Sequence, residues 1–249
     1  MNIVITMAGM GSRFKKAGYE EPKFMIKAKG KTLFEWSMDS LIAFNNGNCK
    51  YIFIVREQDN AKQFIKENMK KYNITNINII EIKELTDGQA TTAKLAKKYW
   101  NEEEALIIYN IDTYIEANQM NLKQIHGDGF IPCFNGEGEH WSFVKLDDNG
   151  KAVEVREKER ISNNCTIGLY YFRNCKLYEK LYNEYYINNN GQANGKNQYE
   201  QKEKYIAPLY NYLIKRGGEV YISTIPTTKV HVLGTPEELE EFKEINLYW

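Results

Sequence analysis

The chain has 249 residues, of which 43% are hydrophobic and 13% aromatic, so it can fill a sizeable core and is not disordered throughout. Its 33 basic and 33 acidic residues cancel, which argues against nucleic acid as a partner, because nucleic-acid-binding proteins normally carry a basic excess or stripe. No segment approaches the roughly 18 apolar residues of a membrane span. We therefore expect a cytoplasmic protein with no membrane partner.

Cysteine and histidine spacing gives no sign of a metal or redox centre. No two of Cys49, Cys133, Cys165 and Cys175 have the C-x-x-C spacing of such sites, so we expect reduced, partly buried thiols. The three histidines form no ligand pair at helical spacing, and each is expected in a surface or packing position.

The first half of the chain alternates strand-like and helix-like segments. Strands are predicted over 2–8, 51–55, 77–82 and 105–111, and helices over 32–44, 59–71 and 90–100. Because the strands are almost continuously apolar, they favour a parallel sheet covered by helices on both faces.

The second half is richer in short strands. A hairpin is predicted from strands 141–146 and 151–156, followed by strands 165–172, 219–225 and 229–233 and helices near 176–186 and 202–215. The polar stretch 188–198 predicts a flexible loop, interpreted as an insertion rather than a lid. A last helix is expected after Thr235 as N-cap, with Pro236 first and Glu238 closing a capping box.

These patterns predict an α/β fold with a Rossmann-like, mixed and mostly parallel sheet flanked by helices, together with a smaller β-rich subdomain. We expect one domain made of two halves, 1–136 and 137–249.

The sharpest local signal is a glycine-containing loop that leaves the first predicted strand, at the sheet edge where open α/β folds bind ligands. Gly9 and Gly11 allow positive φ and close backbone approach, so successive N–H groups can bind phosphate oxygens. Arg13 adds a forked cation suited to pyrophosphate. Phe14 excludes the dinucleotide motif G-x-G-x-x-G, and no P-loop is present. The loop residues are Met7, Ala8, Gly9, Met10, Gly11, Ser12 and Arg13.

Asp112 ends an apolar strand, where an ionised carboxylate is costly unless it meets a cation. Mg²⁺ (or Mn²⁺) bound to one Asp and to triphosphate oxygens would satisfy it. Asn110 shares its face and could bond the metal's waters or the ribose. A turn or helix N-cap role for Asp112 is the structural alternative, but the nearby glycine loop favours the metal-ligand interpretation.

The segment Gly-x-Gly-Ser-Arg followed by Pro22-Lys23 resembles the opening signature of the sugar-phosphate nucleotidyltransferase (NTP-transferase-like) family. Further segments resemble family motifs in the family's order, so the resemblance covers almost the whole chain. They are 86–90, 109–112, 157–158, 168–170, Glu203 and 233–239.

The resemblance implies that an NTP gives its nucleoside monophosphate to a small phosphorylated acceptor and releases pyrophosphate. It implies that Asp87, Gly88 and Gln89 form the base-reading turn. Lys23 and metal-binding Asp112 would stabilise charge around the α-phosphate, while Arg13 and the glycine loop hold pyrophosphate. The half 1–136 would then bind the nucleotide.

On the acceptor side, the resemblance implies that Lys158 meets the acceptor phosphate. Gly168 would lie beside the acceptor, and Glu203 would bond its hydroxyl groups. The half 137–249, including the β-rich subdomain, is therefore expected to bind the acceptor.

Three positions depart from the family pattern: Phe24 and Glu159 replace the usual prolines after the two motif lysines, and Val232 stands where many members have a second metal-binding Asp. The metal would then rest on Asp112 and the nucleotide phosphates, or another carboxylate would substitute for the second Asp. These departures leave two acceptor classes open. The family default is a sugar 1-phosphate, with thymidylyl or uridylyl transfer. The other is a non-sugar phosphate such as phosphocholine or phosphoglutamine, used for capsule or surface-polysaccharide precursors. We favour CTP over dTTP or UTP as the donor.

Two other functional classes are weighed against transfer. A nucleotide-sugar glycosyltransferase would need D-x-D, but Asn110 replaces the first Asp and such enzymes do not need the glycine loop. A non-catalytic nucleotide-binding regulatory module would fit the absence of the second metal-binding Asp, which Val232 replaces. The intact Arg13, Lys23 and Asp112 argue against this module. The sequence leaves the oligomeric state open, a homo-oligomer included.

Overall fold

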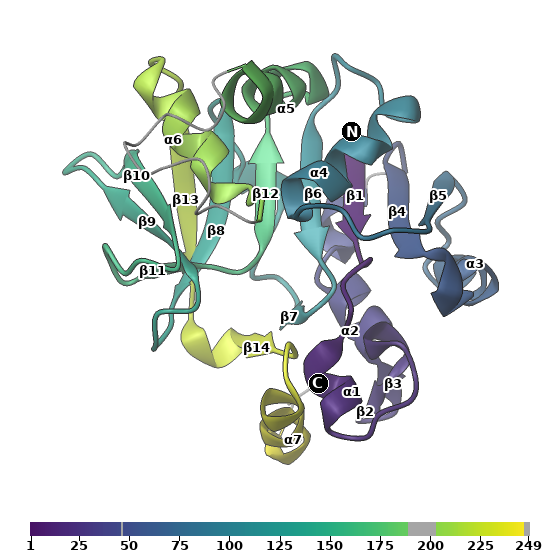
Figure 1. The fold of residues 1–249 in the computed structure, drawn as a ribbon. Coiled ribbons are helices and arrows are strands. Elements are labelled where there is room, and N and C mark those ends of the chain that lie inside the picture. Colours follow the sequence, from purple (N-terminus) through teal and green to yellow (C-terminus); the bar gives the residue numbers. More distant parts are fainter. Residues whose placement is uncertain (46, 189–202, 247–249) are drawn as a thin grey trace.

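The computed structural model describes residues 1–45, 47–188 and 203–246. Its strands belong to one large sheet and two small antiparallel pairs, and helices cover both faces of the large sheet (Figure 1). The large sheet contains β1 (Asn2–Thr6), β4 (Lys50–Arg56), β5 (Ile77–Ile82), β6 (Leu106–Asn110), β8 (Gly129–Asn135), β9 (Ser142–Leu146), β10 (Ala152–Glu157), β11 (Asn164–Thr166), β12 (Leu169–Phe172) and β13 (Val220–Ile225).

The small pairs and the helices complete the described part. The pairs are β2 (Lys27–Ala28) with β3 (Lys31–Thr32), and β7 (Thr113–Ile115) with β14 (Val230–Val232). The helices are α1 (Ser12–Lys16), α2 (Leu33–Asp39), α3 (Lys62–Lys71), α4 (Gln89–Lys94), α5 (Cys175–Tyr182), α6 (Ala207–Lys215) and α7 (Pro236–Glu244).

The large sheet is mixed. Its order is β10-β9-β11-β8-β12-β6-β1-β4-β5, with β13 beside β8. Strands β5, β4, β1 and β6 run parallel, as their apolar sequences predict. The strands from β12 to β10 pair mainly antiparallel, and only β13 lies parallel to β8. The predicted α/β class, with its β-rich second half, is confirmed.

Alternation along the strands divides the core between the two faces of the sheet. Val4, Ile52 and Ile54 point to the face covered by α4, α5 and α6, which lie on the near side in Figure 1. Ile3 and Ile5 point to the opposite face, covered by α2 and α3. Since side chains of a strand alternate between faces, a nearly continuous apolar strand requires this double cover.

A third core cluster forms a lobe below the sheet, where the C-terminal helix meets the N-terminal region (Figure 1). Trp36 of α2 is fully buried, lies 5.3 Å from the ring of Phe242 in α7 and donates a hydrogen bond to the Ala28 carbonyl. Phe14 of α1 and Leu233 are buried in the same cluster. Helix α7 therefore supports the loop that leaves β1, although the two are more than 200 residues apart.

Several predicted boundaries are wrong for identifiable reasons. The single strand predicted over 165–172 is two strands, β11 and β12, because Gly168 has a φ of +80° and leaves the extended conformation between them. Helices predicted over 32–44 and 90–100 are shorter α-helices followed by 3₁₀ turns at Ile42–Phe44 and Leu95–Lys98.

The second-half helices also differ from their predicted bounds. The helix expected over 202–215 begins at Ala207, since the Lys204 backbone bonds to Asp87 and Ala90 instead. Helix α5 continues as a π-helix over Asn183–Asn188. Residues 189–198 of the predicted loop lie outside the described residues.

The start of α7 is confirmed in part. Thr235 Oγ1 accepts a hydrogen bond from the Glu238 N–H at 3.2 Å, as an N-cap does. The Glu238 carboxylate accepts from the Gly234 N–H at 2.8 Å rather than from Thr235, so the predicted capping box is not closed. The carboxylate is thereby turned toward the sheet edge that Gly234 borders.

The four cysteines are all buried and free of disulfides. None of the helices in the described ranges is long and apolar enough to cross a membrane.

Candidate active site

Three parallel strands end at one edge of the sheet, and this edge holds the polar side chains that the sequence singles out. Thr6, the last residue of β1, lies opposite Ile54 of β4 and Asn110 of β6. The glycine loop, Arg56 and Asp112 therefore emerge side by side. A carboxyl edge of parallel strands is where open α/β sheets bind ligands.

The glycine loop presents unbonded amides to this edge. Among the described residues, the N–H groups from Ala8 to Gly11 donate to no other protein group. Gly11 has a φ of +61°, and a Cβ there would lie 3.6 Å from the Cβ of Lys23. Gly9 does not adopt a positive φ, so the expectation of two such glycines holds only for Gly11. Free amides of this kind are suited to phosphate oxygens.

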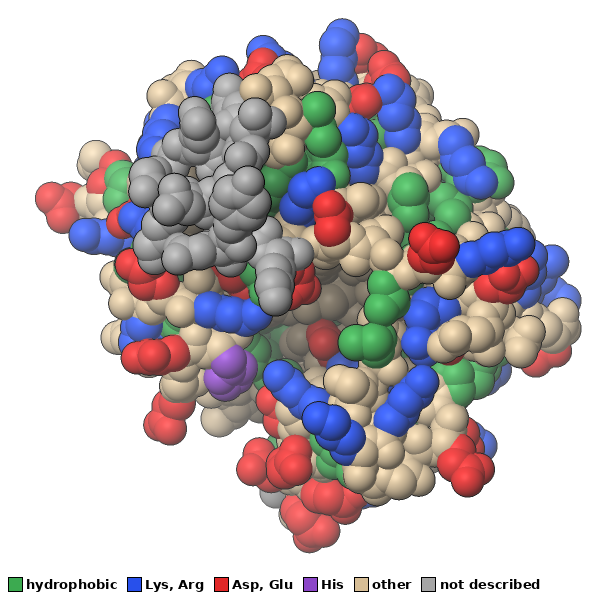
Figure 2. Space-filling view, in the orientation of Figure 1, with side chains coloured by type: hydrophobic (Ala, Val, Ile, Leu, Met, Phe, Trp, Pro, Cys, Tyr) green, Lys and Arg blue, Asp and Glu red, His purple; other side chains and the backbone are tan. Residues whose placement is uncertain are grey.

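The loop lines a cavity of about 470 Å³. Figure 2 shows this face hollowed near its centre, with Lys and Arg side chains along the lower edge of the hollow. Arg56 and Glu21 also border the cavity. The predicted residues that line it are Met7, Gly9, Met10, Gly11, Ser12, Arg13, Lys23, Asn110, Asp112 and Glu203.

Lys23 and Asp112, which both line this cavity, form an ion pair. Lys23 Nζ lies 3.1 Å from Asp112 Oδ2, and the two side chains are 14% and 35% exposed. The Lys23 ammonium also lies 5.7 Å from the centre of the Phe14 ring. A partly buried cation beside a carboxylate that faces solvent can bind an anionic ligand while the carboxylate keeps a free oxygen.

The oxygen donors here fit a divalent cation bound mainly through a ligand's phosphates. Asn110 Oδ1 is buried and has no hydrogen-bond partner in the described part of the chain. The described residues contain no cluster of three or more His, Cys, Asp or Glu side chains that could hold a metal by themselves. Mg²⁺ commonly takes one or two protein carboxylates and completes its shell with phosphate oxygens and water. Asp112 and Asn110 together match that requirement.

A second cavity of about 240 Å³ adjoins the first, and Arg13, Asn110, Asp112, Glu203 and Gly234 line both. Its wall also includes the predicted Gln89 and Gly168, so the start of α4 and the glycine between β11 and β12 border one cavity. The two cavities therefore form one continuous site in which a bound triphosphate could meet a second ligand.

Hydroxyl groups and a half-buried carboxylate also line the second cavity. Glu157 accepts a hydrogen bond from Ser142, whose hydroxyl lies 3.2 Å from the phenol of Tyr170. Burial raises the pKa of Glu157 above its usual value, even though the Ser142 hydrogen bond opposes this. These groups can exchange hydrogen bonds with a polar ligand.

Gly168 has a structural reason to be glycine. Its φ is +80°, and a Cβ there would overlap the side-chain amide of Asn110. The Asn110 N–H donates to the Gly168 carbonyl at 3.2 Å. The glycine therefore makes room for the Asn110 side chain between the two cavities.

Four predicted residues are not among those lining the two cavities: Ala8, Asp87, Gly88 and Lys158. The Asp87 carboxylate pairs with Lys204 Nζ at 2.7 Å, and this pair together with the Thr91 hydroxyl lowers its pKa against the opposing effect of burial. Lys158 Nζ donates to the phenol of Tyr205, which does line the second cavity. Asp87 and Lys158 thus contact Lys204 and Tyr205, of which Tyr205 lines the second cavity.

Other lining residues have no role in the sequence interpretation. Arg56 binds both carboxylate oxygens of Asp59, at 3.1 and 2.7 Å. Its position at the carboxyl end of the predicted strand 51–55 is a sequence signal that could have identified Arg56 as a site residue. Tyr205 reaches the site through a loop conformation that has no local sequence signature, whereas Glu238 belongs to the predicted helix start and lines the site because its carboxylate turns to Gly234.

The comparisons with known proteins agree with this geometry. The sequence matches no protein-family model and no curated protein. A solved nucleoside-diphosphate-sugar pyrophosphorylase from Vibrio cholerae RC9 shares 36% sequence identity, with 98% of this chain and 100% of that chain covered and a TM-score of 0.87. The chain belongs to the sugar-phosphate nucleotidyltransferase family.

More distant structures share the sugar-phosphate nucleotidyltransferase fold. The inositol-1-phosphate CTP transferase of T. maritima has 15% identity and a TM-score of 0.70, with 99% of this chain and 98% of that one covered. The CTP:phosphocholine cytidylyltransferase of Streptococcus pneumoniae has 16% identity and a TM-score of 0.74, with 98% and 97% covered. At these identities the likeness shows the fold alone.

Proposed function

We propose that this protein is a nucleotidyltransferase that moves a nucleoside monophosphate from an NTP, with CTP favoured, onto a small phosphorylated acceptor. The observation that carries the proposal is the meeting of the Lys23–Asp112 pair with the free amides of the glycine loop in one cavity. Binding a triphosphate requires N–H donors and a cation for its phosphate oxygens, next to a carboxylate. A loop with a purely structural role would not require this combination.

In the proposed reaction an acceptor phosphate oxygen attacks the α-phosphorus in line. The new phosphorus–oxygen bond forms as the bond to the β-phosphate oxygen breaks, and pyrophosphate leaves with that electron pair. Lys23 stabilises the charge that develops at the α-phosphate, while Arg13 and the loop amides hold the leaving pyrophosphate. Catalysis is then positioning and charge neutralisation, without a covalent intermediate.

A divalent cation, Mg²⁺ or Mn²⁺, would be held by Asp112 and the NTP phosphates, with Asn110 beside it, and would neutralise phosphate charge when bound. Val232 leaves the usual second carboxylate position without a ligand. The proposed site therefore binds metal chiefly together with the nucleotide.

On the acceptor side, Lys158 brings in the anionic acceptor against its repulsion from the triphosphate. Glu203 and the base-side residues Asp87, Gly88 and Gln89 keep the roles that the family resemblance implies. We propose that the activated product feeds capsule or surface-polysaccharide synthesis.

A sugar 1-phosphate acceptor is a second candidate. The name of the Vibrio cholerae relative, a nucleoside-diphosphate-sugar pyrophosphorylase, favours it. The hydroxyl groups of Ser142, Thr166 and Tyr170 in the second cavity would suit a sugar equally well.

Pyrophosphate release tests the proposal. Each of the four NTPs is incubated with phosphocholine, phosphoglutamine or glucose 1-phosphate in the presence of Mg²⁺. We expect pyrophosphate only when an NTP and an acceptor are both present, and the productive pair distinguishes the two acceptor classes. Tight NTP binding without release for any pair would favour a regulatory module instead.

A further inference from the structure

Residues 203–206, the bridging segment, join the nucleotide side of the site to its acceptor side. On the nucleotide side, the Lys204 N–H donates to the Asp87 carbonyl at 2.6 Å, and the Ala90 N–H donates to the Lys204 carbonyl at 3.0 Å. The Lys204 ammonium pairs with the Asp87 carboxylate at 2.7 Å. Two backbone bonds and an ion pair thus fix one residue against the turn that precedes α4.

The turn is shaped for this contact. Gly88 has a φ of +141°, and a Cβ there would overlap the backbone of Lys204. Only glycine tolerates both the conformation and the close approach. The glycine is therefore required by the bridging segment as well as by any role toward a nucleobase.

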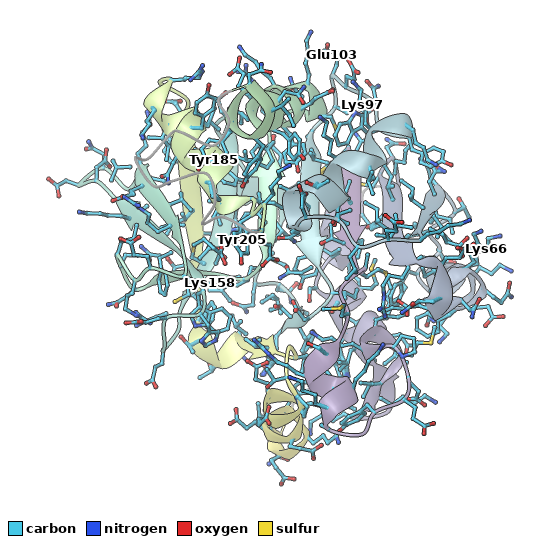
Figure 3. All side chains as sticks on the ribbon, in the orientation of Figure 1. Lys66, Lys97, Glu103, Lys158, Tyr185 and Tyr205 are labelled. Carbon is cyan, nitrogen blue, oxygen red and sulfur yellow. The ribbon has the colours of Figure 1, made fainter. Side chains whose placement is uncertain are left out.

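On the acceptor side, the next residue holds Lys158. The Tyr205 phenol accepts a hydrogen bond from Lys158 Nζ at 2.7 Å and donates one to the Glu203 carboxylate. The ammonium also lies 4.6 Å from the centre of the Tyr205 ring. Figure 3 shows Lys158 and Tyr205 close together, on the side of the molecule that holds α6.

Lys158 has a backbone that needs such support. Its φ is +54°, a conformation that a non-glycine residue keeps only when its surroundings fix it. Its N–H donates to the Trp141 carbonyl at 2.8 Å, which fixes the backbone, while Tyr205 fixes the far end of the side chain. The hydrogen bond with Tyr205 is the largest of the interactions that raise the pKa of Lys158.

We propose that Tyr205 is a positioning residue that aims the Lys158 ammonium at the acceptor phosphate, and that Lys204 anchors the bridging segment to the nucleotide-side turn. The role of Lys158 rests on the proposed function, whereas the contacts of Tyr205 and Lys204 do not. A displacement of the turn before α4 would then move Lys204 and Tyr205, and with them the Lys158 ammonium.

Chemical reactivity of Lys158 tests the positioning without any acceptor. Acetylation of the protein with acetic anhydride is followed by mass spectrometry of the peptide that contains Lys158. In Tyr205→Phe, which keeps the ring but removes the hydroxyl, we expect acetylation of Lys158 to speed up about fivefold, because a hydrogen bond to the charged form is lost. In Lys204→Met we expect the acetylation rate of Lys158 to rise by a smaller factor. In Lys204→Arg, which keeps the positive charge, we expect the wild-type acetylation rate.

Transfer kinetics test the consequence. With CTP and whichever of phosphocholine or glucose 1-phosphate releases pyrophosphate, Tyr205→Phe is expected to raise the KM for the acceptor about tenfold. The kcat and the KM for CTP should change less than about twofold, since binding and not chemistry is weakened. Tyr221→Phe, on β13 and away from both cavities, serves as the matched control.

Unchanged acetylation of Lys158 in Tyr205→Phe would overturn the proposal. A fall of about tenfold in kcat with an unchanged KM for the acceptor would also overturn it. Unchanged acetylation in Lys204→Met would overturn the anchoring by Lys204. If the wild-type protein releases no pyrophosphate with any pair, the proposed function fails, while the acetylation experiment still decides whether Tyr205 holds Lys158.

Discussion

At the scale of single residues, the site depends on a few side chains whose neighbours leave them little choice of position. Lys23 is held between the Asp112 carboxylate and the Phe14 ring, and Gly234 borders both charges, with the Glu238 carboxylate also close to it. A Cβ at Gly234 would lie 3.8 Å from Asp112 Oδ2 and 3.9 Å from Lys23 Nζ. Such preorganisation allows a cation to act on a transition state without moving.

Replacing Lys23 with alanine tests this arrangement. We expect Lys23→Ala to lower kcat roughly 10²-fold or more, because a preorganised charge at the α-phosphate is removed. The measurement is steady-state pyrophosphate release at saturating NTP and acceptor. Lys15→Ala, another lysine at the rim of the same cavity, is the control for a general change of charge. Near-normal turnover in Lys23→Ala would remove Lys23 from the mechanism.

Gly168 gives a second residue-scale prediction, on stability. Gly168→Ala combines a φ of +80° with overlap onto the Asn110 amide, whereas Gly150 has a φ of +79° with open space around the same position. We expect Gly150→Ala to lower the free energy of unfolding by about 1 kcal/mol, and Gly168→Ala by about 3 kcal/mol. Urea unfolding of the two variants measures the difference. Equal losses would mean that Asn110 is not packed against Gly168 as described.

At the scale of elements, the sequence predicted those parts that local patterns determine. The apolar strands β1, β4, β5 and β6 and their parallel pairing follow from composition and alternation with helices. Strand β8 was not predicted, because Pro132 interrupts it and proline is a poor signal for a strand inside a sheet. Its neighbours are β11, β12 and β13, which lie far away in the sequence.

The site divides in the same way. The glycine loop, Asn110 and Asp112 were predictable, since they lie at or just after the ends of apolar strands at the same sheet edge. Tyr205 was not, because its place depends on how the Lys204 backbone meets Gly88, a contact between segments more than 100 residues apart. Tertiary contacts of this kind leave no periodic signal in the sequence.

Strand β14 carries a titratable side chain that links stability to pH. His231 is buried, stacks on Tyr114 at 5.4 Å and lies 3.1 Å from one carboxylate oxygen of Glu116, whose other oxygen pairs with Lys229. Burial lowers the pKa of His231 below its ordinary value of about 6.5, and Glu116 offsets this only in part.

The sign of the pH effect follows from that shift. As pH falls below about 6.5, the unfolded chain takes up a proton at His231 before the folded protein does, so the free energy of unfolding falls. We expect His231→Phe, which keeps a ring but cannot titrate, to show a shallower fall between pH 6.5 and 5 in urea unfolding. Identical slopes for the wild type and the variant would contradict the lowered pKa.

At the scale of the whole molecule, one sheet carries strands from both halves of the chain and borders both cavities. The parallel strands deliver the glycine loop, Asn110 and Asp112, while the antiparallel strands deliver Ser142, Glu157 and Gly168 to the adjoining cavity. The C-terminal helix closes the lobe under the loop through the third core cluster. The division of roles between 1–136 and 137–249 stays a prediction.

The proposed reaction moves a nucleoside monophosphate from an NTP to a second ligand in these joined cavities. The most direct measurement follows the label of each α-³²P-labelled NTP by thin-layer chromatography, with Mg²⁺ and the acceptor panel. We expect a new labelled, phosphatase-resistant product that requires the acceptor and is lost in Lys23→Ala. Label that stays in the NTP, or passes to the monophosphate equally with and without acceptor, would contradict it.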